Sequence, residues 1–351
     1  MRVSAVAAVE NSFRIPSLGT QRRLKILNLR RALQRSSESG RIVDVSPKWR
    51  KSLCKTAGMY LTSTAPHARP WCELPAADAR CVVGVLTDID DTLTTLGAIT
   101  PDARAALAAL CAAGLHVIAI TGRPMGWCEP FAQALDRGGW PVDAIVAENG
   151  AVALFREGDV LTTEYAQDAP TRARNAHRLR EVAARVLREV PGAALARDSA
   201  GRVTDIAIDH AEFAHLDRAQ VDAVQAVMRE EGMTATVSSI HVNGWFGENT
   251  KLSGARWIVR RLLARDLDAE RERWVYVGDS TNDQLMFGHF PLSVGVANLM
   301  AFADVLTTWP RYLTRGARGA GFAEVAARLL AERWVDVSTR HEASRDRGVP
   351  D

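Results

Sequence analysis

The feature that most constrains the fold is an apolar run that ends abruptly in two acidic residues. Val82 to Leu86 is followed by Asp88 and Asp90. Such a run is typical of a strand covered on both faces of a parallel sheet, and open α/β sheets bind ligands beyond the carboxyl ends of these strands. Two acids this close need a cation, a proton or a phosphoryl group to offset their repulsion. An isolated pair is more often a turn or helix cap, so this interpretation needs support from elsewhere in the chain.

Two further segments supply that support by repeating the pattern of a buried strand followed by polar residues. The second strand is expected at 117–120 and the third at 274–277, and Lys251, between them, begins a stretch with helical spacing of apolar residues. The polar residues that follow these two strands are Thr121, Gly122, Asp279, Asn282 and Asp283. Because the carboxyl ends of parallel strands share one edge of the sheet, these groups are expected to converge.

The order of these motifs resembles that of the haloacid dehalogenase superfamily of phosphatases. The resemblance covers about residues 82–332, and Glu148-Asn149-Gly150 is similar to the signature of its class IIB branch, which acts on sugar phosphates and has a Cof-type cap. It implies an α/β fold: a Rossmann-like parallel sheet core with an inserted α/β cap domain. The motif residues that carry the resemblance are Asp88, Asp90, Thr92, Thr121, Lys251, Gly278, Asp279, Asn282 and Asp283.

The resemblance also implies the role of each site residue. Asp88 is the nucleophile, Asp90 is the general acid and base and is oriented by Thr92, and Lys251 stabilises the phosphate and the intermediate. A phosphate dianion repels a carboxylate unless a cation intervenes, and Mg²⁺ with oxygen ligands meets that need. The implied Mg²⁺ ligands are Asp88, the backbone carbonyl of Asp90, and Asp279. The core residues assigned to phosphate or substrate binding are Thr121, Gly122, Asn282 and Asp283, the last as an acid behind the metal ligands.

The alternation of strands and helices predicts the domain organisation. The core is expected at 81–151 and 246–335, with a helix from Pro101 to Ala113, further strands at 143–147 and 292–296, and a closing helix from Gly321 to Trp334. The cap is expected at 152–245, because about a hundred residues are too many for a connection. Its predicted elements are a hairpin at 152–163, helices at 171–190 and 217–231, and strands at 203–208 and 235–242.

Substrate recognition is expected on the cap, because the core motifs contact only a phosphate. Asn243 and His241 are the candidate sugar contacts, although both could instead face solvent, and Trp245 could simply pack the hinge. Arg123 could meet an anionic substrate group or pair with an acid, and the sequence leaves this choice open.

Charge is distributed unevenly along the chain. Residues 1–80 contain 15 Lys and Arg against 5 Asp and Glu, although the net charge of the whole chain is only +3. This segment is interpreted as a basic N-terminal extension that is disordered, and 336–351 as a disordered tail. A transit peptide and a nucleic-acid tether are alternatives. We favour a dispensable extension, with Met59 as a second possible start, and do not expect nucleic acid to be the partner.

Composition is ordinary for a globular enzyme, with 47% hydrophobic and 24% charged residues. No apolar run is long enough to span a membrane. The five cysteines show no CxxC spacing, which favours free thiols in a reducing compartment, and we expect a cytoplasmic protein. The oligomeric state cannot be inferred from the sequence.

The resulting hypothesis is a Mg²⁺-dependent phosphatase that hydrolyses a small phosphorylated sugar or glycoside through an aspartyl-phosphate. By resemblance, the phosphates of sucrose, trehalose, mannosylglycerate and glucosylglycerate are all candidates. A phosphotransferase or phosphomutase of the same superfamily is an alternative that the motifs do not exclude. A glycosyltransferase that binds a metal and a nucleotide sugar at Asp88 and Asp90 would leave Lys251 and Asp279 without a role, and a non-catalytic nucleic-acid-binding protein would rest on the basic extension alone.

Overall fold

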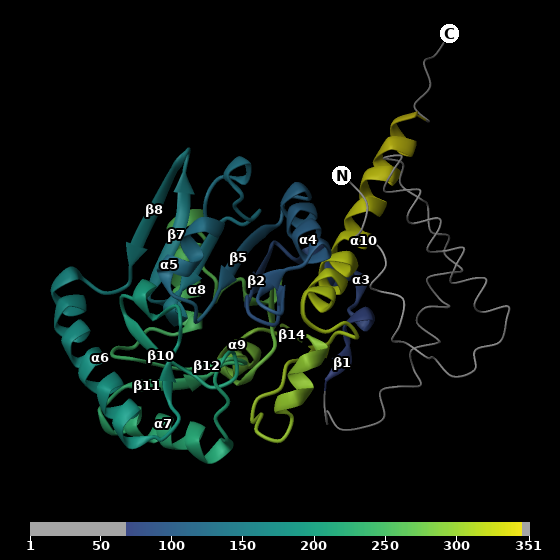
Figure 1. Ribbon diagram of the computed structural model, residues 1–351. Helices are drawn as coiled ribbons and strands as arrows, with labels where there is room; N and C mark the ends of the chain where they lie inside the picture. Colours follow the sequence, from purple (N-terminus) through teal and green to yellow (C-terminus); the bar gives the residue numbers. More distant parts are fainter. Residues whose placement is uncertain (1–67, 346–351) are drawn as a thin grey trace, which may run out of the picture. The chain divides into compact units, whose positions relative to one another are not determined.

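The structure is a computed structural model that describes residues 68–345 (Figure 1). The expectations for residues 1–67 and 346–351, including the nature of the basic extension, lie outside the described residues. Within 68–345, no helix is both long enough and apolar enough to cross a membrane.

One large sheet forms the centre of the molecule. Its nine strands lie in the order β1-β15-β14-β13-β2-β5-β6-β7-β8, and all neighbours from β1 to β6 are parallel. The strands are β1 (Arg69–Pro70), β2 (Gly84–Thr87), β5 (His116–Ile120), β6 (Ala144–Ala147), β7 (Val152–Glu157), β8 (Val160–Tyr165), β13 (Trp274–Gly278), β14 (Leu292–Gly295) and β15 (Tyr312–Leu313). The five strands predicted for the core are all present, and the predicted Rossmann-like class is confirmed.

Helices cover both faces of this sheet because its strands are apolar on both sides. Val85 belongs to the cluster that packs under α4 (Pro101–Ala112) and α10 (Arg318–Arg345), whereas its neighbour Leu86 belongs to the cluster under α8 (Lys251–Leu263) and α9 (Gln284–His289). Successive residues of a strand point to opposite faces, so a strand buried on both sides must be apolar throughout. Helix α4 begins as the sequence predicts, with Thr100 as its N-cap and proline in its first turn.

The segment just before the core is part of the fold, contrary to expectation. Residues 68–80 were expected to be disordered, but β1, the single turn η1 (Trp71–Glu73) and α3 (Ala76–Cys81) lie there. Trp71 is fully buried, stacks edge-on against Tyr312 at 5.4 Å between ring centroids, and donates from its indole to the carbonyl of Val325. Val325 is 254 residues away in the chain and Tyr312 is similarly distant, so no local pattern indicates these partners.

The expectation of a disordered tail is also wrong in part. Helix α10 continues through residue 345, ten residues into the segment predicted to be disordered. No glycine or proline interrupts the sequence between Gly321 and Gly348, so nothing in the local chemistry ends the helix where the apolar pattern fades.

A second, smaller sheet lies in the insertion between the core motifs (Figure 1). Its order is β11-β12-β10-β9, with helices α6 and α7 packed on it through an apolar cluster of their own. The elements are α6 (Ala169–Glu189), β9 (Ala194–Leu195), β10 (Asp205–Asp209), α7 (Arg218–Glu230), β11 (Thr234–Val237) and β12 (His241–Trp245). This confirms an inserted α/β unit, and we propose that residues 169–245 form the cap.

Two details of the insertion differ from the prediction. The hairpin of β7 and β8 pairs with β6 and extends the large sheet, so residues 152–165 belong with the core by their hydrogen bonds. The single strand expected at 235–242 is instead a hairpin of β11 and β12. Ser238 closes its turn by donating its backbone N–H to the carbonyl of His241, which a reading of alternating apolar residues does not reveal.

Candidate active site

The three motif strands are neighbours in the large sheet. β2 lies between β13 and β5, and Val277, Thr87 and Ala119 stand side by side in register. The chain therefore leaves all three strands at the same edge, just before Asp279, Asp88 and Thr121. The convergence that the sequence predicts for these groups is present.

Lys251 bridges two of the acids. Its Nζ lies 2.6 Å from Asp88 Oδ1 and 2.7 Å from Asp283 Oδ1, and its side chain is only 3% exposed. The lysine is the first residue of α8, where Thr250 and Ser253 form a capping box. Gly150 allows the start of α8 to lie close to the backbone of the 148–150 segment. Its φ is +101°, and a Cβ on this residue would lie 2.0 Å from the carbonyl oxygen of Thr250.

Asp283 is satisfied entirely by protein groups. One oxygen accepts from Lys251 and from the hydroxyl of Tyr276, and the other accepts from the backbone amides of Asp279, at 2.9 Å, and Ser280, at 3.1 Å. Gly278 leaves room for this carboxylate, since a Cβ there would lie 2.5 Å from it. Asp283 thus contacts Lys251 and the backbone of the Asp279 loop. Its expected role as an acid behind the metal ligands stays a prediction.

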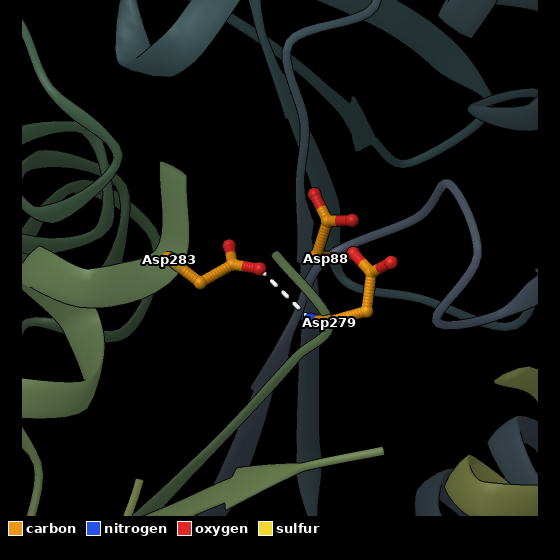
Figure 2. Close-up of side chains that lie close together, drawn as sticks. All are labelled: Asp88, Asp279 and Asp283. Atoms are coloured by element: carbon orange, nitrogen blue, oxygen red, sulfur yellow. Dashed lines mark hydrogen bonds between the residues drawn. The ribbon is translucent and has the colours of Figure 1, made fainter. Parts of the chain in front are cut away.

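Three carboxylates could hold a cation (Figure 2). Oxygens of Asp88, Asp279 and Asp283 lie within 4.8 Å of one another, and all three residues are buried. Asp279 Oδ2 accepts a hydrogen bond from Asn298, whereas its Oδ1 is buried with no hydrogen-bond partner. Buried polar atoms normally have a hydrogen-bond partner, so a buried carboxylate oxygen that accepts no hydrogen bond is available to coordinate a metal ion. Because Asp283 is already satisfied, Asp88 and Asp279 are the two side chains that fit Mg²⁺.

The electrostatics of the cluster also call for a cation. Burial raises the pKa of Asp88 to about 7, against the lowering effect of Lys251. Burial and the nearby Asp88 and Asp283 raise the pKa of Asp279 well above its usual value. Burial alone would lower the pKa of Lys251, but the charges of Asp283 and Asp88 outweigh it and raise that pKa. One lysine therefore does not neutralise three buried acids, and a divalent cation would complete the balance.

The residues predicted to bind phosphate follow strands that end at the same edge of the sheet as this cluster. Thr121 is buried, and its hydroxyl oxygen accepts from the amide of Arg123, which leaves its O–H as a donor. The side-chain oxygen of Asn282 lies 3.4 Å from Lys251 Nζ. At Gly122, a Cβ would lie 3.2–3.3 Å from side-chain atoms of Asn243 and Asn149, so this backbone sits in a tight polar enclosure.

Asp90 is held differently from what the resemblance implied. The hydroxyl of Thr92 is buried with no hydrogen-bond partner. Arg123 instead binds both oxygens of Asp90, at 2.9–3.1 Å. The question that the sequence left open for Arg123 is thus answered in favour of an acid partner.

The two predicted sugar contacts lie where the cap meets the core. His241 is 2% exposed, and its Nε2 lies 3.0 Å from Glu212 Oε2. Asn243 is 1% exposed and donates to the carbonyl of Gly122 and to Asp205. Contact with a sugar stays a prediction for both. Trp245 is buried, and its indole donates to the carbonyl of Asn249, which fits the packing role considered for it.

Several residues that build the site were not singled out for a role from the sequence. Glu148 is fully buried and accepts from the amides of Val203 and Thr204, which anchors the segment just before β10 to the core. Asn298 bridges Asp279 and the carbonyl of Asp91. Glu148 stands in the signature segment 148–150, beside an asparagine and a glycine, the residue types that most readily adopt a positive φ. An acid next to such a pair was therefore a usable signal in the sequence, whereas Asn298 offered none.

A family comparison agrees with this geometry. The model of haloacid dehalogenase-like hydrolases matches residues 85–176, which include Asp88, Thr121 and the large-sheet strands from β2 to β8. Residues 85–176 are thus similar to the haloacid dehalogenase-like hydrolases. The part of the chain that contains Lys251 and Asp279 lies outside the matched segment, and its place in the site comes from the geometry described above. Among curated proteins, the comparison found no match.

Several solved structures resemble this chain in fold. A sucrose-phosphatase from Synechocystis sp. PCC6803, crystallised with sucrose and phosphate, matches with a TM-score of 0.52 at 16% identity, covering 71% of this chain and 98% of its own. The C-terminal domain of trehalose-6-phosphate phosphatase from C. albicans matches with a TM-score of 0.53 at 15% identity, covering 76% and 99%. Protein 0175 of Thermoplasma acidophilum gives 0.53 at 16%, covering 71% and 98%. At this identity, the likeness concerns the fold.

Proposed function

We propose that this protein is a Mg²⁺-dependent phosphatase of class IIB that cleaves a small phosphorylated sugar or glycoside through an aspartyl-phosphate. The observation that supports this most strongly is the buried group of Asp88, Lys251 and Asp279 at the carboxyl edge of the sheet. A carboxylate nucleophile, a fixed ammonium and a second acid with an unpartnered oxygen are the parts that phosphoryl transfer to a carboxylate requires.

In this proposal, Asp88 attacks the phosphorus and the ester oxygen leaves with a proton from Asp90. Water then attacks the phosphorus of the aspartyl-phosphate, and Asp90 takes up the proton that the water loses. The bond between phosphorus and the Asp88 oxygen breaks, which releases inorganic phosphate and restores the carboxylate. Lys251 stands 2.6 Å from Asp88 Oδ1 and stabilises the negative charge that gathers there, while Thr121 offers its O–H to a phosphoryl oxygen. The cap shields the reacting groups from bulk water.

The metal would be held by Asp88, Asp279 and the backbone carbonyl of Asp90. When bound, Mg²⁺ offsets the charge of the phosphate dianion and so lets the carboxylate approach it. Asn298 supports this assignment by fixing Asp279 Oδ2 and leaving Oδ1 available.

The proposed substrate class is supported by the inserted cap and by the fold of the sucrose- and trehalose-phosphate phosphatases. We also propose the reducing cytoplasm as the compartment, because the five cysteines of the sequence show no CxxC spacing.

Release of inorganic phosphate from a panel of sugar phosphates, with and without Mg²⁺, tests the proposal. We expect turnover with Mg²⁺, none in EDTA, and a loss of at least about 10⁴-fold in Asp88→Asn, as for a covalent nucleophile. Substantial activity in Asp88→Asn would refute its role. Transfer of the phosphoryl group to a second sugar without release of phosphate would favour the phosphotransferase alternative.

A further inference from the structure

The carboxylate of Asp90 is fixed by one guanidinium. Arg123 Nε lies 3.1 and 3.0 Å from its two oxygens, and Nη2 lies 2.9 Å from Oδ1. The side chains are 5% and 12% exposed, so little water competes for these bonds. Because the guanidinium is planar and its donors have fixed directions, three bonds define the plane of the Asp90 carboxylate.

The remaining donors of Arg123 are taken by the cap. Nη1 donates to Asp198 at 3.1 Å and to Glu212 at 3.3 Å, and Nη2 donates to Glu212 at 2.7 Å. With Asp90, these acids engage all five N–H groups of the guanidinium. The indole of Trp127 lies beside it, 5.0 Å from its central carbon to the ring centroid. Arg123 therefore has no donor left for an anionic group of a substrate.

The two cap acids are rigid partners. Arg202 donates to Asp198 at 3.2 Å, and the backbone amide of Glu212 donates to Asp209 at 2.9 Å. Burial alone would raise the pKa of Glu212, but hydrogen bonds from His241 and Arg123 outweigh it and bring that pKa to about 2. Glu212 is thus negatively charged. Because it belongs to the cap, its distance from Asp90 depends on whether the cap is docked on the core.

We propose that Arg123 is a positioning residue that couples the orientation of Asp90 to the docking of the cap through Asp198 and Glu212. If the cap withdraws, Arg123 loses three of its bonds and its plane is no longer fixed, so Asp90 loses the direction in which it delivers a proton. Acid catalysis would then require the closed state, in which water is excluded. The inference has two halves. The mechanical half, that Arg123 ties the cap to Asp90, does not depend on the proposed function. The catalytic half, that this tie orients Asp90 to deliver a proton, rests on the proposed function.

Hydrogen exchange tests the mechanical half without any assay of activity. In the full chain, Arg123→Lys keeps the charge but cannot bind Asp90 and both cap acids at once. We expect peptides that cover 198–214 to exchange at least about 10-fold faster than in the wild type, because local opening of the cap becomes easier. Unchanged exchange would overturn the coupling.

Arg185→Lys is the matched control. Arg185 also binds three acids, Glu189, Glu230 and Glu231, but all of them lie within the cap and at its surface. This variant should leave exchange in 198–214 as in the wild type. If Arg123→Lys does not fold, the double variant Asp198→Asn with Glu212→Gln removes the cap anions, leaves the bonds between Arg123 and Asp90, and carries the same expectation.

The dependence of rate on the leaving group tests the catalytic half. An alkyl phosphate needs its leaving oxygen protonated, whereas p-nitrophenyl phosphate does not. In Arg123→Lys, the ratio of first-turnover rates on the alkyl and nitrophenyl esters should fall about 10²-fold, the lower end of what a general acid contributes. An equal loss on both esters would mean a merely structural role and would overturn the proposal.

Failure of the proposed function gives a different result. If the wild type releases phosphate from neither ester, the phosphatase proposal fails and the leaving-group half of the inference fails with it. The exchange experiment still decides whether Arg123 couples the cap to the segment of Asp90.

Discussion

Replacing Asp88 by Asn should stabilise the metal-free protein while it abolishes turnover. Asp88 is buried next to Asp283 and Asp90, and Lys251 does not fully offset that environment. Asparagine has nearly the same shape without the charge. The expectation is therefore the opposite of the usual one, in which loss of a buried ion pair destabilises a fold.

The magnitude follows from the pKa of Asp88. Burial raises it from 3.8 to about 7, and each pKa unit corresponds to about 1.4 kcal/mol. Ionised Asp88 therefore costs the metal-free fold at most about 4 kcal/mol at pH 8. Between pH 3.8 and 7 the folded state binds this proton more tightly than the unfolded state. The free energy of unfolding of the metal-free wild type is thus highest, as far as Asp88 is concerned, at low pH. It decreases as the pH rises through 7.

Urea unfolding in EDTA, followed by the fluorescence of the nine tryptophans, measures the effect. At pH 8 the Asp88→Asn variant should unfold at higher urea than the wild type, and the difference should shrink as the pH falls to 5. Saturating Mg²⁺ should narrow the gap at pH 8, because the ion binds the folded wild type through a charge that the variant lacks.

The opposite outcome would refute the reasoning. If Asp88→Asn unfolded at lower urea than the wild type in EDTA at pH 8, the attraction between Lys251 and Asp88 would outweigh the burial of the acid. The cluster would then be stable without a metal, and the electrostatic support for a cation would be lost.

Three further predictions follow from single contacts. Asn298→Leu should weaken Mg²⁺ binding about 10–100-fold in calorimetry, because Asp279 loses the donor that orients it; unchanged affinity would contradict this. Trp71→Ala should lower the free energy of unfolding by about 3–5 kcal/mol, whereas a disordered 68–80 segment would show no change. Neutral sugar phosphates should be cleaved with a higher kcat/KM than carboxylate-bearing ones, such as glycosyl phosphoglycerates, because Arg123 has no free donor; the reverse order would count against that arrangement.

The sequence predicts the core strands and the convergence of Asp88, Asp279 and Thr121 because these depend on local chemistry. A strand buried on both faces must be apolar along its length, and a parallel sheet brings the ends of such strands to one edge. Lys251 could be added from the order of the motifs and the start of a helix. Their assigned roles stay predictions.

The limits of the core were harder to predict from the sequence because they depend on partners that are distant in the chain. Trp71 is ordered by Tyr312 and the backbone of Val325, and the hairpin at 152–165 joins the core because β6 has an open edge. Neither partner is visible in a window of neighbouring residues. Periodicity therefore identified these segments poorly, although it identified helices such as α4 well.

The acid pair that opens the first motif shows the division most clearly. The sequence alone determined that Asp88 and Asp90 follow a buried strand, because a strand buried on both faces consists of consecutive apolar residues. Only the tertiary structure decided that Asp88 faces Lys251 and that Asp90 is bound by Arg123 together with two acids of the cap. Side chains 33 to 163 residues apart meet through packing of whole elements, and the spacing of residues along the chain does not encode that packing.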